Sequence, residues 1–198
     1  MTPERRNRLE TVLKARQPDL TIILENVFDP HNVSAVMRTC DAVGVQELYI
    51  LTNRIPRHKK WGPKSSSSAA KWMTVHQFDD INLCVEAVRR RYSRILTTHL
   101  SGDAVPLYQL DLTQPTALVF GNEHSGVSEE MRAKADGNFI IPQVGIIRSL
   151  NISVACAVSL YEAMRQKTLA GHYQRDDLGN EMKQQLMQEW ELKDENDH

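Results

Sequence analysis

Short apolar runs alternate with amphipathic segments along the 198-residue chain, and this alternation constrains the fold more than any other feature. Residues 20–24, 48–51 and 116–120 are apolar runs of strand length. Between the first two runs, residues 33, 36, 37 and 40 are apolar at the i, i+3, i+4, i+7 spacing of a helix. Strands that alternate with helices favour an α/β fold, with a largely parallel sheet and helices on both faces.

The same patterns, followed along the whole chain, give a set of expected elements. The expected strands are residues 20–24, 48–51, 72–76, 93–98, 116–120 and 138–141. The expected helices are residues 3–16, 29–44, 81–91, 128–134, 152–169 and 181–190. Residues 53–68, with two prolines, a glycine and four consecutive serines, are expected to form a long loop.

The charge of the chain is unevenly distributed. Residues 174–198 hold eight acidic and three basic side chains, a net charge of −5, whereas residues 1–173 hold 17 acidic and 21 basic ones, a net charge of +4. Within the latter part, residues 54–71 carry six bases and no acid. The overall charge of −1 therefore leaves a polyanionic partner open, although a solvated basic surface would give the same pattern.

Several classes of protein are disfavoured by the sequence. Cys40, Cys84 and Cys156 form no CxxC pair, which argues against a disulfide framework or a structural zinc site. The N-terminus lacks the apolar stretch of a signal peptide, and no run approaches the ~18 apolar residues that a membrane span needs. We therefore expect a cytoplasmic protein without a membrane segment.

Distinctive polar residues follow the expected strands, at the edge of a parallel sheet where ligands usually bind. They occur at residues 29–32, 98–101, 121–126 and 141–142. Asn32 either caps the next helix or belongs to a site, and Arg38 in that helix could present its guanidinium to a phosphate or carboxylate. The GxGxxG and GxSxG patterns are absent, and the histidines show no metal-ligand spacing, so we expect no metal.

Three ordered motifs carry a resemblance to a known family. NVSAVMR (residues 32–38), FGNE (120–123) and IIPQVGIIRSLNISVA (140–155) resemble the motifs of the SpoU branch of the SPOUT RNA methyltransferases. Residues 16–21, 29–32 and 38–45 are more narrowly similar to its TrmH type, the tRNA guanosine-18 2′-O-methyltransferases. The resemblance extends over about residues 5–170.

This resemblance implies a homodimer whose C-terminal part is a deep trefoil knot that binds S-adenosyl-L-methionine (AdoMet). It divides the chain into a basic N-terminal helix (residues 1–18), a SPOUT methyltransferase domain (19–170) and an acidic, helical C-terminal extension (171–198). The implied cofactor-binding residues are Thr98, His99, Leu100, Gly121, Ile141, Ile147, Ser149 and Leu150. The implied catalytic residues are Arg38, acting from its own subunit or across the dimer interface, together with Asn32, Glu123, Ser149 and Asn151.

The implied reaction is methylation of the ribose 2′-OH of guanosine 18 in the D-loop of tRNA. The positions implied in tRNA binding are Arg5, Arg8, Arg16, His31, Arg165 and Lys167, whereas the basic loop at 53–71 departs from the family. Arg38 would be the general base in the family's scheme, but arginine stays protonated, so it could instead stabilise the alkoxide or bind the adjacent phosphate. Methylation of ribosomal RNA and non-catalytic RNA binding are the alternatives.

Overall fold

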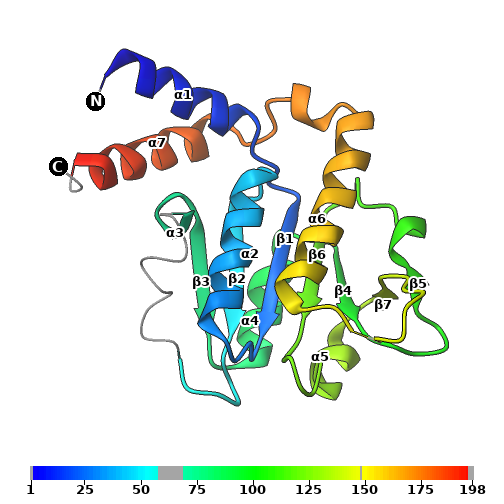
Figure 1. The fold of residues 1–198 in the computed structure, drawn as a ribbon. Helices are drawn as coiled ribbons and strands as arrows, with labels where there is room; N and C mark the ends of the chain where they lie inside the picture. Colours follow the sequence, from blue (N-terminus) through cyan, green and yellow to red (C-terminus); the bar gives the residue numbers. More distant parts are fainter. Residues whose placement is uncertain (1, 58–68, 148, 196–198) are drawn as a thin grey trace.

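A parallel sheet with helices on both faces forms the centre of the computed structural model, which describes residues 2–57, 69–147 and 149–195 (Figure 1). The strands pair in the order β3-β2-β1-β6-β4-β7-β5, and every pairing between them is parallel. The strands are β1 (Leu20–Glu25), β2 (Glu47–Leu51), β3 (Thr74–Phe78), β4 (Arg94–Thr98), β5 (Val105–Pro106), β6 (Thr116–Phe120) and β7 (Gly137–Ile140).

Seven α-helices and two 3₁₀ turns are described before, between and after these strands. They are α1 (Pro3–Lys14), α2 (Pro30–Ala42), α3 (Ala69–Trp72), α4 (Ile81–Arg89), η1 (Leu107–Gln109), α5 (Glu129–Lys134), α6 (Ile152–Leu169), η2 (His172–Gln174) and α7 (Asn180–Glu195). The α/β class and the parallel, helix-covered sheet predicted from the sequence are thus confirmed.

The two faces of the sheet bury separate apolar clusters. In β1, Leu20, Ile22 and Leu24 pack with α2 and α6, whereas Ile23 belongs to the cluster that includes residues of α4 and α5. This split follows from the strand period, because successive side chains point to opposite faces. All six residues of β1 are buried, which explains why its residues do not alternate between apolar and exposed polar side chains.

The N-terminal and C-terminal helices pack against each other beside the start of β1 (Figure 1). Their shared cluster buries Leu9, Leu13, Leu186 and Trp190, and the indole of Trp190 meets Trp72 edge-on at 5.6 Å. The acidic helix α7 therefore contacts the basic helix α1, and Arg6 and Glu191 form an ion pair across this contact.

Three local predictions need correction. Trp72, the first residue of the expected strand 72–76, instead ends the short helix α3, where its ring packs edge-on against Trp190; the strand begins at Thr74. Asn32 does not cap α2, since the side chain of Asp29 does so by accepting a hydrogen bond from the backbone N–H of His31. The two-residue edge strand β5 has no counterpart in the predicted elements.

The turn after α2 uses glycine for a physical reason. Gly44 has a φ of +83°, and a Cβ there would lie 2.5 Å from the backbone oxygen of Ala15. Its carbonyl accepts a hydrogen bond from Gln17, which joins this turn to the start of β1. The basic loop expected at residues 53–68 lies mostly outside the described residues.

Candidate functional site

The carboxyl ends of β4, β6 and β7 surround a cavity of about 590 Å³. Seven of the eight predicted cofactor-binding residues line it: Thr98, His99, Leu100, Gly121, Ile141, Ser149 and Leu150. Ile147, the eighth, does not line the cavity, and its side chain is 73 % exposed. Three loops that are distant in sequence thus form one wall, as expected for the carboxyl edge of a parallel sheet.

The loop after β6 is a tight turn that leaves no space for side chains at its base. Asn122 and Gly126 exchange backbone hydrogen bonds of 3.1 and 2.8 Å. A Cβ on Gly121 would lie 2.1 Å from the backbone carbon of Gly126, so position 121 admits only glycine in this turn. The side chain of Asn122 donates to the backbone oxygen of Asn26 at 2.7 Å and accepts from His124, which fixes the loop against the end of β1.

Glu123 connects this loop to the start of α2. Its carboxylate accepts hydrogen bonds from the backbone N–H groups of Phe28 (3.0 Å) and Asp29 (3.5 Å) and from Asn32 Nδ2 (2.8 Å). A negative charge at the N-terminus of a helix is also favoured by the helix dipole. From its place in the loop after β6, Glu123 therefore stabilises the turn between β1 and α2.

The ionisation of Glu123 is set by the same contacts. Desolvation alone would raise its pKa, but the hydrogen bonds from Phe28, Asn32 and Asp29 outweigh it and the pKa is lowered. The group is a carboxylate near neutral pH, and both of its oxygens already accept hydrogen bonds. It is suited to positioning neighbours rather than to collecting a proton.

The hydrogen bonds continue from Glu123 through Asn32 to the start of α6, which lies within the third motif. Asn151 Nδ2 donates to Asn32 Oδ1 at 3.2 Å, and Asn151 Oδ1 caps α6 by accepting from the backbone N–H of Ser153. Four of the five predicted catalytic residues are therefore brought together: Asn32 is bonded to both Glu123 and Asn151, and Ser149 lies in the cavity wall.

Arg38 is the predicted catalytic residue that lies apart from this group. It is exposed on α2 and does not line the cavity. It follows Asn32 by six residues, which corresponds to about 9 Å along a helix axis. The cavity of one chain is therefore formed without the guanidinium that the resemblance assigns to catalysis.

The six predicted RNA-binding residues divide into two groups. Arg5, Arg8 and His31 are exposed, and so is Arg165, which pairs with Glu162 at 2.8 Å. Lys167 and Arg16 are instead buried, with side-chain exposures of 0 %.

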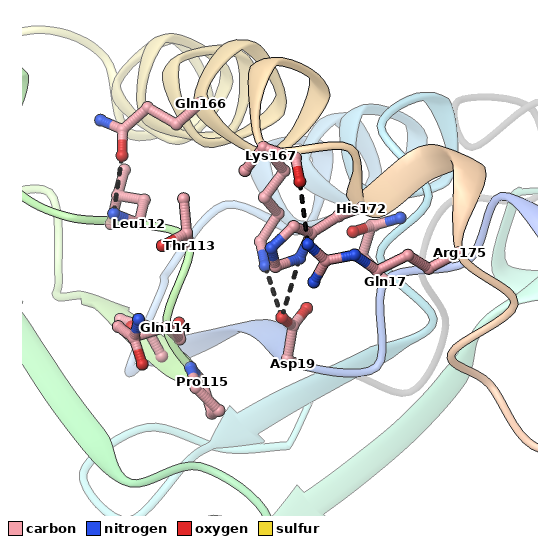
Figure 2. A network of polar contacts seen from close by, with 12 residues as sticks. Gln17, Asp19, Leu112, Thr113, Gln114, Pro115, Gln166, Lys167, His172 and Arg175 are labelled. Atoms are coloured by element: carbon pink, nitrogen blue, oxygen red, sulfur yellow. Dashed lines mark hydrogen bonds and ion pairs between the residues drawn. The ribbon is translucent and has the colours of Figure 1, made fainter.

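Both buried cations have structural partners, which corrects the expectation that they contact RNA. Lys167 Nζ lies 2.7 Å from Asp19 Oδ2, and His172 approaches the same carboxylate at 3.4 Å (Figure 2). Arg16 pairs with Asp41 at 2.7 Å and lies over the ring of Trp190. Phosphate oxygens cannot reach cations that are enclosed in this way without displacing their carboxylate partners.

The sequence reasoning missed part of the cavity wall. Phe120, Asn122, Gln143 and Ala155 also line it, although each lies within or beside a recognised motif. No periodicity or charge distinguishes these positions, because their role follows from loop geometry.

No group of three or more His, Cys, Asp or Glu side chains in the described part of the chain is arranged to hold a metal ion. No helix among the described residues is long and apolar enough to span a bilayer.

Comparison with known proteins identifies the family. The SpoU rRNA Methylase family matches residues 19–161, which include every segment of the cavity wall. The tRNA (guanosine(18)-2′-O)-methyltransferase of Thermus thermophilus is 44 % identical over 191 residues, 96 % of each chain. The TrmH/SpoU tRNA modifying enzyme of Aquifex aeolicus superposes with a TM-score of 0.88 at 38 % identity, covering 96 % of both chains.

A more distantly related solved structure contains a bound cofactor. The SpoU methyltransferase AviRb of Streptomyces viridochromogenes, crystallised with AdoMet, has a TM-score of 0.68 at 26 % identity, over 75 % of this chain and 60 % of its own. The α/β fold of this chain is thus the fold of SpoU-type methyltransferases. The chain belongs to the SpoU methylase family.

The close approach at Gly121 predicts a strong effect of a single methyl group. Gly121→Ala should destabilise the fold by about 1–3 kcal/mol, because the turn between residues 121 and 126 must open to admit the Cβ. Gly102→Ala is the matched control, since a Cβ there meets nothing within 4 Å. Urea unfolding of both variants measures the difference, and equal stabilities would contradict the described turn.

The lowered pKa of Glu123 predicts a pH-dependent contribution to stability. Because the pKa is lower in the folded state, the contribution is present above the ordinary value of 4.5 and is lost as the pH falls through the folded-state pKa. Glu123→Gln should therefore cost about 1 kcal/mol at pH 7, a value reduced by the exposure of the group, and progressively less below pH 4.5. Unfolding free energies from pH 3 to 7 test this, and a difference that grows on acidification would refute it.

Proposed function

We propose that this protein transfers the methyl group of AdoMet to the ribose 2′-OH of guanosine 18 in the D-loop of tRNA. The observation that carries the proposal is the 44 % identity, over 96 % of both chains, to the Thermus thermophilus enzyme named for that reaction. The cavity supports it, because the polar residues of all three motifs meet at one edge of the sheet. The proposed reaction belongs to tRNA processing and, with tRNA as its substrate, to the cytoplasm.

The residues of the cavity fit AdoMet as the methyl donor. The segments 98–100, 121–126, 141–143 and 149–151 supply lining residues at the carboxyl edge of the sheet, and the turn at Gly121 brings backbone close to the cavity. Seven of the residues that the resemblance implies would hold the cofactor: Thr98, His99, Leu100, Gly121, Ile141, Ser149 and Leu150. We further propose that the C-terminal part of the fold forms a deep trefoil knot, as in the SPOUT fold, so that the chain topology holds the cavity wall.

Bound AdoMet would supply a methyl group on a sulfonium, a good leaving group that requires no metal. The protein must then align the 2′-oxygen with that methyl group and manage the hydroxyl proton. Glu123 and Asn32 are engaged in hydrogen bonds that fix the start of α2 and Asn151, so they position the site. The guanidinium of Arg38 offers hydrogen-bond donors only and is suited to the developing alkoxide or to the phosphate beside it.

We propose that the active species is a homodimer in which Arg38 completes the partner's cavity. Large apolar side chains are exposed on the segment after β7 and on α6: Val144, Ile146, Ile147, Val154 and Tyr161. Val154 and Tyr161 are seven residues apart and therefore share one face of α6. Exposed apolar groups of this kind mark an interaction surface, and α6 packs beside α2, which carries Arg38.

We propose that the exposed basic side chains bind the tRNA backbone. Arg5, Arg8, His31 and Arg165 are accessible to phosphates, and contacts of this kind orient a nucleic acid without reading its sequence. An unpaired loop nucleotide such as one in the D-loop is the usual target of sequence-specific RNA recognition.

The decisive experiment incubates the protein with labelled AdoMet and unmodified tRNA and then maps the 2′-O-methyl group. We expect one methyl group at guanosine 18, and no transfer to a matched tRNA that carries 2′-deoxyguanosine there. Transfer to ribosomal RNA but not to tRNA would favour the second candidate, which the name of the matched family suggests. Absence of transfer to either RNA would indicate a non-catalytic RNA-binding protein.

The role of Arg38 can be tested in mixed dimers. Arg38→Lys should lower kcat at least ~100-fold, because the planar guanidinium is lost, while the affinity for AdoMet is retained. Ser125→Trp, at an exposed position of the cavity wall, should block AdoMet binding instead. Dimers that combine the two variants should regain about half of the activity, since one intact cavity then faces one intact Arg38. Mixed dimers without activity would place Arg38 in its own subunit's site, and full activity of the Arg38→Lys variant by itself would place Arg38 outside catalysis.

A further inference from the structure

Behind the cavity wall, an arginine outside the family motifs contacts one of the lining residues. His99 follows β4, and its backbone N–H donates to the carbonyl of Phe139 at 3.3 Å. The imidazole ring of His99 contacts Arg132, whose Nη1 lies 2.5 Å from His99 Nε2. Arg132 belongs to α5 and does not itself line the cavity.

The helix that carries Arg132 is held in place independently of this contact. Ser128 caps α5 by accepting from the backbone N–H of Met131, and its own hydroxyl and N–H donate to the carboxylate of Glu25 at 2.5 and 2.8 Å. The backbone N–H of Arg132 donates to the carbonyl of Ser128 at 3.0 Å. Arg132 thus extends toward His99 from a helix fixed to the end of β1.

The contact determines which nitrogen of His99 carries hydrogen. Arginine has donors only, so His99 Nε2 must accept, and the neutral ring then has its hydrogen on Nδ1. Nδ1 makes no hydrogen bond to any described residue and is not among the buried unpaired atoms. The ring therefore leaves an N–H donor free on a residue of the cavity wall.

The state of Arg132 supports a role beyond packing. Its Nε is buried and has no hydrogen-bond partner among the described residues. An unpaired buried N–H is costly, and such costs are found where a group is held for a function.

We propose that Arg132 is a positioning residue for the cofactor, which holds His99 as the neutral Nδ1–H tautomer so that the ring donates a hydrogen bond to an acceptor oxygen or nitrogen of AdoMet. This inference rests on the proposed function, because it names AdoMet as the occupant of the cavity. Arg132 acts through His99 and touches neither the ribose nor the methyl group.

The tautomer can be measured on the free protein, independently of any activity. In the intact chain, ¹⁵N NMR of the imidazole should show a hydrogen on Nδ1 and none on Nε2 of His99. In Arg132→Met the ring should shift toward the Nε2–H form that free imidazole side chains prefer, whereas Lys134→Met, a loss of charge on the same helix, should leave it unchanged. An Nε2–H ring in the intact chain would overturn the proposal.

Calorimetric AdoMet binding then separates positioning from a structural role. Arg132→Met and His99→Phe should each weaken binding about three- to tenfold, the range for one hydrogen bond, and Arg132→Lys should restore part of the loss. Because both residues act through one contact, the double variant should bind no more weakly than His99→Phe alone. If the loss of AdoMet affinity in the double variant equals the product of the two single losses, the coupling is refuted. An unsubstituted chain that binds no AdoMet would refute the proposed function itself.

Discussion

The carboxylate of Glu123 is the interaction on which the rest of the site depends. It accepts hydrogen bonds from the β1–α2 turn and from Asn32, and Asn32 in turn accepts from Asn151 at the start of α6. Through these three contacts the loop after β6 sets the positions of two helices that pack side by side on the sheet. Without a charge at this point, three backbone and side-chain donors would lack their acceptor, and the cavity would lose one fixed edge.

The buried cations show a different use of charge. Arg16 and Lys167 are both buried. Arg16, before β1, pairs with Asp41 of α2, and Lys167 of α6 pairs with Asp19, which also precedes β1. Breaking one partner of such a pair is costly because the other charge stays buried. The family resemblance assigned both residues to RNA, and their burial separates the cations that hold the body together from those that face solvent.

The sequence predicts the sheet, most helices and the meeting of the motifs, since apolar periodicity and strand-end residues are local signals. The helix over residues 152–169 is predicted with both ends correct, because Asn151 supplies a recognisable cap. The packing of α7 on α1 was not predictable, because Leu186 and Trp190 gain their meaning only when Trp72 is placed beside them. The contact between His99 and Arg132 joins residues 33 positions apart, and no pattern in the sequence predicts it.

The fixed join between the cavity loop and α2 has a thermodynamic consequence. Glu123 belongs to the cavity wall and also holds the first turn of α2, so the two cannot move independently. Any molecule whose binding energy depends on the position of the 121–126 loop must therefore also shift the balance of orientations of α2. By reciprocity, whatever engages the exposed face of α2 changes the affinity of the cavity by the same factor.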